Sequence, residues 1–407
     1  MQKHNQQVEL LITGIGITSN IGQCKDSFTS ALLKGDSVFG KVQRLGRQLE
    51  GKSFLGAEIS DLTYPEDFPK RFLRSASFSS SVALVTLKEA WDEAELDNYE
   101  PERIGLIVGG SNFQQRHLQQ IHQKHQTQPQ FLTPTYGFSF LDTDLAALCT
   151  EHFAIKGLAY TVGGASASGQ LAIIEAAKAL QSGQVDICIA LGALMDLSAW
   201  ELQGFRALGA MGSEKYRDEP QKACRPFDQN RDGFIYGENC GAIVLERGNI
   251  RNKIKPYAKL TGWALAMDAN RNPNPSHEGE LKVIQQTLRQ ARLSSSDIDY
   301  INPHGTGSPL GDETELKALK SAKLNQAYIN ASKSIIGHGL TSAGTVEVIA
   351  TLLQMKALKL HPSLNLETPI DNSFNWVKEK TIEHKIKKAL TLSMGFGGIN
   401  TALCLEK

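Results

Sequence analysis

Apolar runs with strand character alternate with amphipathic helical runs along almost the whole chain, and this alternation constrains the fold more than any other feature. In the first half, the strand-like runs 103–108, 158–162 and 185–191 are separated by helical periodicity at 141–152 and 170–180. Run 185–191 is apolar apart from one aspartate, as in strands buried inside a parallel sheet. The pattern predicts an α/β protein whose helices cover its sheet.

A second series of the same kind follows, and no linker rich in Pro, Gly or Ser precedes it. We therefore predict two fused, pseudo-repeated halves, residues 1–240 and 241–407. In the second half we expect strands at 241–246, 258–264, 300–302, 327–330, 390–393 and 402–405 and helices at 278–291, 313–319 and 343–358.

Charge and cysteine content exclude several classes of function. Lys and Arg number 43 and Asp and Glu also 43, so the formal net charge is +0 and nothing favours nucleic acid or an anionic membrane. Residues 1–9 are polar and 10–12 form only a short apolar run, so we expect no signal peptide, no membrane span and a cytoplasmic location. The cysteines lack C-x-x-C spacing, which predicts reduced, mostly buried thiols at Cys24, Cys149, Cys188, Cys224, Cys240 and Cys404.

Residues 162–169, Val-Gly-Gly-Ala-Ser-Ala-Ser-Gly, connect an expected strand to an expected helix. Such a turn puts one side chain, here Ser166, at the mouth of a pocket and near the positive end of the helix dipole. The glycines can equally serve close packing of the strand and the helix. The hydrolase pattern G-x-S-x-G fails at its last position. The octet alone leaves both interpretations open.

Two patterns that could suggest a metal site do not support one. Residues 228–233 match the first half of a calcium loop, but Asn239 stands where the bidentate glutamate is required. His117, His122 and His125 lie in a Gln-rich tract, but no two of them stand at i and i+4 beside a carboxylate. We therefore predict a solvated helix or loop there and no metal ion in the protein.

The second half contains two histidines in glycine-flanked loops that follow short strands. His304 lies in Asn-Pro-His-Gly-Thr-Gly, residues 302–307, and His338 lies in Lys-Ser-Ile-Ile-Gly-His-Gly, residues 333–339. Side chains at the C-terminal ends of parallel strands are where α/β folds hold their chemistry. The two histidines are therefore candidates for one site.

Two further segments are expected to border this site. The glycines of loop 393–400 would let backbone N–H groups approach an oxyanion. The segment after strand 185–191 carries large side chains that we expect in the pocket wall, namely Met195, Trp200 and Phe205.

Together these features resemble the thiolase-fold ketosynthases, the β-ketoacyl-ACP synthases. The resemblance covers nearly the whole chain and rests on Ile-Thr-Gly-Ile-Gly at 12–16, the block 225–233, His-Gly-Thr at 304–306 with Gly-Asp at 311–312, the segment 333–338, and Gly-Phe-Gly-Gly at 395–398. It implies a thiolase-like fold in which two βαβαβ-type halves form a layered α/β/α/β/α architecture.

The resemblance also implies roles for single residues. In that family, a cysteine in the turn after the third strand is acylated, and two histidines complete the site. The catalytic positions of the family correspond here to Ser166, His304, His338 and Lys333. The supporting positions are Glu347 as ion-pair partner of the lysine, Phe396 as the gating residue, and Gly397 and Thr306 as contacts to the substrate or its oxyanion.

Ser166 departs from the family pattern at the nucleophile. A helix N-terminus readily lowers the pKa of a cysteine from about 8.5. The dipole contributes about 0.3 to 1 kcal/mol, and a pKa shift of one unit needs about 1.36 kcal/mol, so it cannot ionise a serine hydroxyl near neutral pH. Decarboxylation of a malonyl thioester needs no such nucleophile, because two neutral imidazoles can stabilise the enolate in a dry pocket.

We therefore expect a malonyl-ACP decarboxylase that makes acetyl-ACP for polyketide β-branching, with no cofactor except the phosphopantetheine of the acyl carrier protein. The resemblance further implies an acyl carrier protein as partner, a homodimer built along strand 158–162, and a downstream HMG-CoA-synthase-like enzyme. Two alternatives stay open. One is a non-catalytic chain-length-factor-like partner of an active ketosynthase, and the other is a Ser-dependent acyltransferase in which a histidine activates Ser166.

Overall fold

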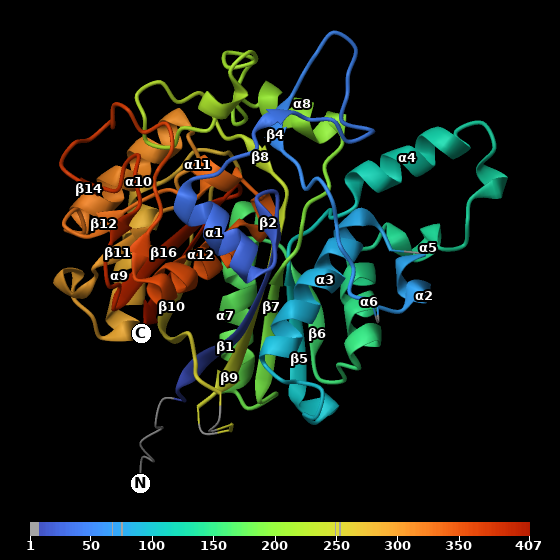
Figure 1. Cartoon of the computed structure of the whole chain (residues 1–407), viewed down its shortest axis with the longest axis horizontal. Helices are drawn as coiled ribbons and strands as arrows, with labels where there is room; N and C mark the ends of the chain where they lie inside the picture. The colour runs from blue at the N-terminus through green and yellow to red at the C-terminus, as the bar shows by residue number, and fades with distance from the viewer. Residues whose placement is uncertain (1–7, 67, 75, 249, 252–253) are drawn as a thin grey trace.

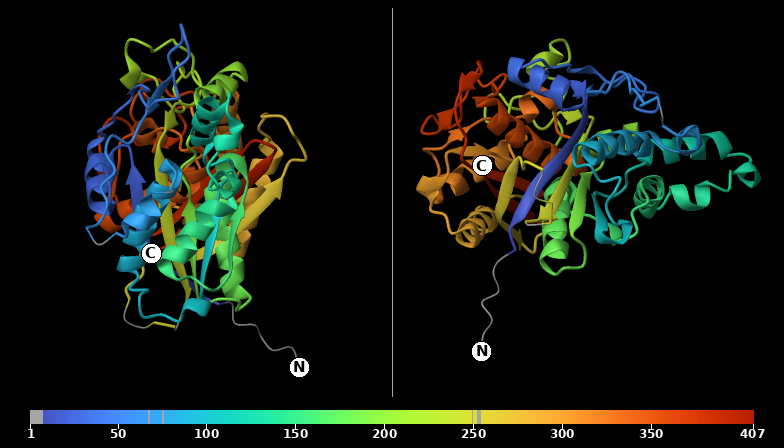
Figure 2. Two further views of the ribbon diagram at one scale, coloured as in Figure 1. Left: turned by 90° about the vertical axis from the view of Figure 1, so that its right-hand side faces the viewer. Right: turned by 60° about the horizontal axis from the view of Figure 1, so that its bottom comes forward.

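The computed structural model describes residues 8–66, 68–74, 76–248, 250–251 and 254–407, so most of the polar start at residues 1–9 lies outside the described residues. Figure 1 shows one layered body, and the views in Figure 2 show a smaller arm that projects from it. The arm carries α4 (Gln115–His125) and α5 (Tyr136–Ser139).

The first half forms one side of the central sheet. Its strands are arranged in the order β6-β5-β7-β9-β1. β5 pairs in parallel with β6 and β7, whereas β9 runs antiparallel to both β7 and β1. The strands are β1 (Leu10–Ser19), β5 (Ile104–Gly109), β6 (Ala159–Val162), β7 (Ile187–Gly192) and β9 (Asn239–Arg247).

The second half repeats this arrangement in the order β12-β11-β16-β17-β10, with β14 added beyond β12. β11 pairs in parallel with β12 and β16, and β17 runs antiparallel to β16 and β10. The strands are β10 (Ala258–Met267), β11 (Tyr300–Asn302), β12 (Tyr328–Ile329), β14 (Asn375–Trp376), β16 (Lys388–Gly395) and β17 (Ile399–Glu406). The two halves therefore share one topology.

The two half-sheets join where β1 pairs with β10, at Leu11 with Lys259 and Ile12 with Ala258. Apolar side chains fill three layers around them. Three pairs of helices make these layers: α3 (Phe78–Glu93) and α6 (Thr143–Phe153) outside the first half, α7 (Ser168–Gln181) and α12 (Ala343–Ala357) between the halves, and α9 (His277–Ala291) and α10 (Pro309–Ser321) outside the second. The layered thiolase-like architecture is confirmed.

Smaller elements connect these layers. They are β2 (Gly22–Gln23), α1 (Lys25–Lys34), β3 (Gly40–Lys41), β4 (Leu55–Ala57), α2 (Lys70–Leu73), α8 (Ala199–Ala207), β8 (Tyr236–Gly237), α11 (Lys333–Ile336), β13 (Lys359–Leu360) and β15 (Ile382–Glu383).

Two expectations about the sheet need correction. The predicted division at residue 240 falls inside β9, whose pairing with β7 and β1 makes it a strand of the first half. The sheet therefore divides between Arg247 and Ala258. β7 is buried along its whole length, as expected, but it has a parallel neighbour on one side only.

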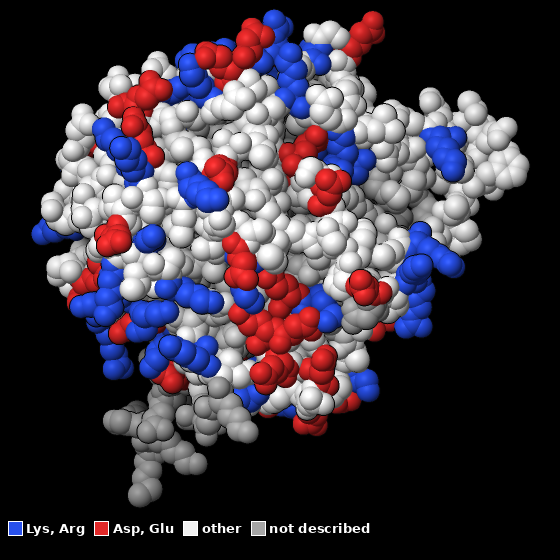
Figure 3. Space-filling view, viewed as in Figure 1, with Lys and Arg blue, Asp and Glu red and all other residues white. Residues whose placement is uncertain are grey.

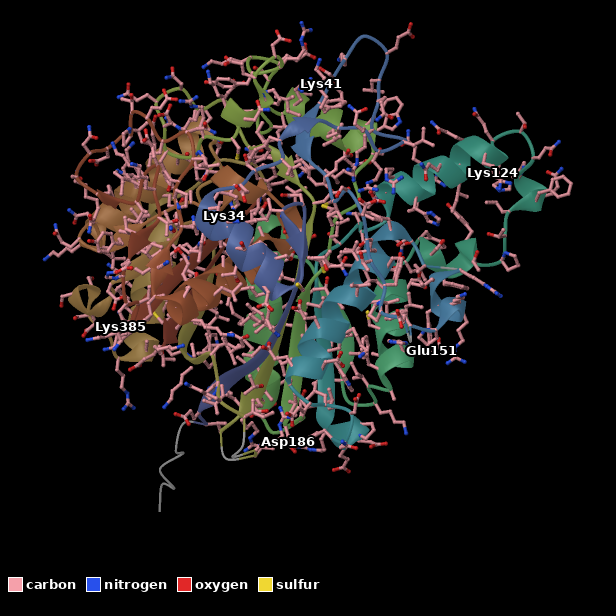
Figure 4. All side chains as sticks on the ribbon, viewed as in Figure 1. Lys34, Lys41, Lys124, Glu151, Asp186 and Lys385 are labelled. Carbon is pink, nitrogen blue, oxygen red and sulfur yellow. The ribbon has the colours of Figure 1, made fainter. Side chains whose placement is uncertain are left out.

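The surface of the protein agrees with its balanced composition. Both acidic and basic side chains lie on the face in Figure 3, where acidic ones gather near the lower middle and mostly basic ones at the lower left. The Gln- and His-rich tract forms the solvated helix α4, from which Lys124 projects (Figure 4). Cys24 is exposed and the other five cysteines are buried, as expected. Within the described residues, no helix combines the length and the apolar character that crossing a bilayer requires.

The two central helices cross very closely near their N-termini. A Cβ atom at Gly169 in α7 would lie 2.6 Å from the backbone nitrogen of Thr345 in α12, and one at Gly344 would lie 2.5 Å from the backbone nitrogen of Gln170. Side chains at either position would push the helices apart. The packing interpretation of the glycine-rich octet therefore holds for Gly169, independently of any role for Ser166.

We predict that Gly169→Ala lowers the free energy of unfolding by about 1 to 3 kcal/mol, because the added methyl group meets backbone atoms that cannot rotate away. Gly204→Ala in α8 is the control, since a Cβ atom there would have no other atom within 4 Å and alanine favours a helix by about 0.5 to 1 kcal/mol. Denaturant unfolding measures both. Equal effects of the two substitutions would contradict the close crossing.

Candidate active site

Ser166 lies in a single 3-10 turn, Ala165–Ala167, between the end of β6 and the start of α7. Ala165 adopts a left-handed φ of 47°, which costs a non-glycine residue about 1 to 3 kcal/mol. The turn directs Ser166 into a cavity, where the side chain is 9% exposed. The surrounding packing thus maintains a strained backbone directly beside the predicted site residue.

His338 contacts this serine, with 2.9 Å between Ser166 Oγ and His338 Nε2. Its loop follows the short helix α11 rather than a strand, which corrects the expected placement. The backbone N–H of His338 donates to the carbonyl of Ile235 at 2.7 Å, and the N–H of Gly237 donates to the carbonyl of His338 at 3.1 Å. These two bonds to Ile235 and Gly237 hold the backbone of His338 in place.

His304 completes a compact group of three side chains. Its ring lies edge-on to that of His338, with centroids 5.5 Å apart and an interplanar angle of 83°. Burial lowers the pKa of both imidazoles well below the ordinary histidine value, and the positive charge of Lys333 lowers these pKa values further. Both rings are therefore neutral at neutral pH. Within the described part of the chain, Nδ1 of each ring is buried and has no hydrogen-bond partner.

Two carboxyl groups and one ammonium group hold the His304 loop. Glu315 accepts hydrogen bonds from the backbone N–H groups of His304, at 2.6 Å, and Gly305, at 2.8 Å. Asp312 accepts hydrogen bonds from the backbone N–H groups of Thr306, at 3.2 Å, and Gly307, at 3.1 Å. The Nζ atom of Lys333 donates to the carbonyl oxygen of His304. The loop is therefore held in place by the buried side chains of Glu315, Asp312 and Lys333.

Lys333 also forms the ion pair that the family resemblance implies. The Lys333 side chain is 2% exposed, and its Nζ atom contacts Glu347 Oε1. Burial raises the pKa of Glu347 to about 7, although the ammonium group of Lys333 opposes this rise. The pair joins α11 to the central helix α12 directly behind the two histidines.

The side chains of Ser166, His304 and His338 line one cavity of about 560 Å³. This volume is within the usual range for a small-molecule site. Of the expected wall residues, Met195 and Phe205 line it, whereas Trp200 is 65% exposed and does not. Phe205 is five positions after Trp200, which turns the two side chains roughly 140° apart around α8.

The predicted glycine-rich loop 393–400 is a tight hairpin, because β16 extends to Gly395 and β17 begins at Ile399. Phe396 lines the cavity, as does Thr306 from the His304 loop. Gly397 is at the tip of the hairpin and is not a lining residue, whereas Gly395 and Gly398 are. The structure therefore does not bring Gly397 to the position expected of an oxyanion or substrate contact.

Three buried carboxyl groups near the site received no role from the sequence: Glu280, Asp312 and Glu315. Burial raises the pKa of Asp312 to about 6 and that of Glu315 to about 8, and it raises the pKa of Glu280 well above the ordinary value. Each carboxyl interrupts the apolar face of an amphipathic helix, α9 or α10. The sequence did contain a signal that could have identified these three carboxyl groups. Each is an acidic residue at a position where the helical period requires an apolar one.

The fold and the cavity together define an enzyme-like thiolase-fold protein with a buried alcohol where the family carries a thiol. The chain belongs to the β-ketoacyl synthase family. Residues 8–249 match the beta-ketoacyl synthase N-terminal domain, and residues 257–367 match the C-terminal domain.

Individual relatives agree with this assignment. The chain is 60% identical over 400 residues to the polyketide biosynthesis malonyl-ACP decarboxylase PksF of Bacillus subtilis (strain 168), covering 98% of this chain and 96% of that protein. The ishigamide ketosynthase/chain length factor superposes with a TM-score of 0.88 at 24% identity, covering 98% and 99% of the two chains. A ketosynthase solved with its type II acyl-carrier protein, AntDE with AntF, gives 0.87 at 24% identity, covering 98% and 100%. These two structures confirm the fold.

We predict that removing the buried ion pair, in the double variant Lys333→Met with Glu347→Gln, raises the pKa of His304 and of His338. Both pKa values should stay below about 6.5, because burial remains. NMR titration of the imidazole C–H signals measures the change. Lys88→Met, which removes a partly exposed helix ion pair with Asp92, is the control and should leave both pKa values unchanged. Unchanged values in the double variant would contradict the electrostatic role of Lys333.

Proposed function

We propose that this protein is a malonyl-ACP decarboxylase that produces acetyl-ACP and CO2. The observation that carries the proposal is the contact between an alcohol, Ser166, and the neutral imidazole of His338, beside a second neutral imidazole in a buried cavity. The 60% identity to a protein named as a malonyl-ACP decarboxylase supports the same activity.

The proposed reaction uses the histidines as hydrogen-bond donors. The bond between the carboxylate and the α-carbon of the malonyl thioester breaks, CO2 leaves, and the electron pair moves toward the thioester oxygen. His304 and His338 donate N–H hydrogen bonds to that enolate oxygen, each with its ring proton on the nitrogen that faces the cavity. Their lowered pKa values suit this role, because a neutral imidazole stays a donor throughout the reaction. One proton then adds to the α-carbon and gives the acetyl thioester.

The Ser-dependent acyltransferase is less well supported. A histidine that activates a serine must itself take up a proton, and the lowered pKa of His338 opposes this step. An activating histidine is also usually oriented by a carboxylate, and among the described residues His338 Nδ1 has no hydrogen-bond partner. Ser166 therefore acts as a contact that positions the thioester.

A purely structural role, as in a chain-length-factor-like subunit, would not require a buried ion pair behind the His304 loop. The buried ammonium of Lys333 is costly to maintain, yet it pairs with Glu347 and holds the His304 loop at the cavity. Such an arrangement supports catalysis by the chain itself.

The substrate and partners follow from the same proposal. An acyl carrier protein delivers the malonyl group on its phosphopantetheine, and no other cofactor is needed. The name of the relative places that protein in polyketide biosynthesis. For this chain, supply of acetyl-ACP to an HMG-CoA-synthase-like enzyme for β-branching, and a cytoplasmic location, stay predictions.

A homodimer along β6 is also proposed. β6 is the edge strand of the sheet, and Tyr160 on it is 39% exposed. The neighbouring arm exposes further large apolar side chains, at Phe131, Phe138, Phe140 and Leu141. An edge strand beside exposed aromatic side chains favours pairing with a second copy. A solution mass twice that of the chain is the expected outcome.

We predict that Ser166→Ala retains most of the CO2 release from malonyl-ACP, whereas His304→Ala lowers kcat by about 10² to 10³, the usual effect of losing one oxyanion donor. Product mass identifies acetyl-ACP, and circular dichroism checks the fold of each variant. His117→Ala on the projecting arm is the matched histidine control and should behave as the wild type. Equal inactivity of folded Ser166→Ala and His304→Ala would contradict the proposed mechanism.

A further inference from the structure

Glu280 is a carboxyl group in the active-site cavity that the reaction described above does not use. It lies in the first turns of α9, is 1% exposed, and lines the same cavity as Ser166, His304 and His338. Its Oε2 atom is buried and has no hydrogen-bond partner among the described residues. A buried carboxylate without a partner carries a large desolvation cost, which protonation removes.

Among the described residues, the charged groups that act on the pKa of Glu280 are all acidic. They are Glu315 and Asp312 on α10 and Asp268 just after β10. Burial raises the pKa of Glu280 well above its ordinary value, and these three carboxyl groups raise this pKa further. The Nε atom of Arg231 lies 3.8 Å from Asp312 Oδ2, so its positive charge compensates the carboxylate of Asp312 rather than that of Glu280. Burial and these neighbouring carboxyl groups therefore favour the protonated, neutral form of Glu280.

The other acids of the cavity are already engaged. Glu315 and Asp312 accept hydrogen bonds from the backbone of the His304 loop. Asp268 accepts from the side-chain amide of Asn400 at 2.9 Å. The two imidazoles are neutral and serve the enolate oxygen in the proposed mechanism. Glu280 thus combines a proton with a free oxygen atom inside the cavity.

Decarboxylation consumes one proton, because the α-carbon exchanges a carboxylate for a hydrogen. We propose that Glu280 is the acid that donates this proton to the α-carbon of the enolate, an inference that rests on the proposed decarboxylase function. The O–H bond of Glu280 breaks, and the enolate electron pair forms the new C–H bond. The carboxylate of Glu280 then recovers a proton from solvent through the open mouth of the cavity.

The test compares Glu280→Gln with wild type and with Glu278→Gln, an exposed control on the same helix. Glutamine replaces a neutral acid by a neutral amide, so the melting temperature should not change. We expect kcat for acetyl-ACP formation to fall about 10²-fold in Glu280→Gln only. In an equal mixture of H2O and D2O, the deuterium content of the acetyl methyl group should also change in this variant, since water becomes the donor.

A second variant keeps the test independent of folding. Glu280→Ala opens space for a small carboxylic acid, and added acetate should restore acetyl-ACP formation in proportion to its protonated fraction, so that rescue weakens as pH rises. The role of Glu280 would be overturned if Glu280→Gln had the same kcat and the same methyl deuterium content as the wild type, or if acetate did not rescue Glu280→Ala. Either result would leave the decarboxylase proposal intact. Failure of wild type to make any acetyl-ACP would overturn both.

Discussion

The buried ammonium of Lys333 is the charge on which the rest of the site depends. It binds Glu347 on the central helix α12 and the carbonyl of His304, so it joins the His304 loop to that helix. Loss of one partner of such a buried pair costs about 3 to 5 kcal/mol. The same charge disfavours protonation of His304 and His338, which keeps both imidazoles in the form that donates to an enolate.

Against this background, the alcohol at position 166 separates two reactions that a ketosynthase site combines. Storing an acyl chain requires an activated nucleophile. A thiol ionises near neutral pH, whereas the alcohol of Ser166 does not, and the lowered pKa of His338 makes this histidine a poor base for it. Stabilising an enolate requires only neutral donors in a cavity that excludes water. The serine therefore removes the first reaction in our account and leaves the second, with Glu280 as the proposed source of the final proton.

Strand and helix periods are local signals, and they predicted an α/β fold of two repeated halves. The layered architecture and the grouping of Ser166 with His304 and His338 followed from the resemblance to the ketosynthases. Strand pairing could not be predicted in the same way. The assignment of β9 to the first half depends on hydrogen bonds to β1 and β7, which are far from it in the sequence. The predictions were wrong for Trp200, whose side chain points away from the cavity on α8, and for Gly397, whose backbone lies at a hairpin tip outside the cavity lining. The raised pKa of Glu280 depends on burial and on three neighbouring carboxyl groups, which only the tertiary structure brings together.

The most direct test of the central claim is the mass of the protein itself after incubation with an acyl carrier protein loaded with a long acyl chain. Wild type and Ser166→Cys differ by one atom at the site, oxygen or sulfur. Our account predicts that the wild-type protein keeps its mass, whereas Ser166→Cys gains the mass of the acyl group. An acyl adduct on Ser166 of the wild type would contradict it.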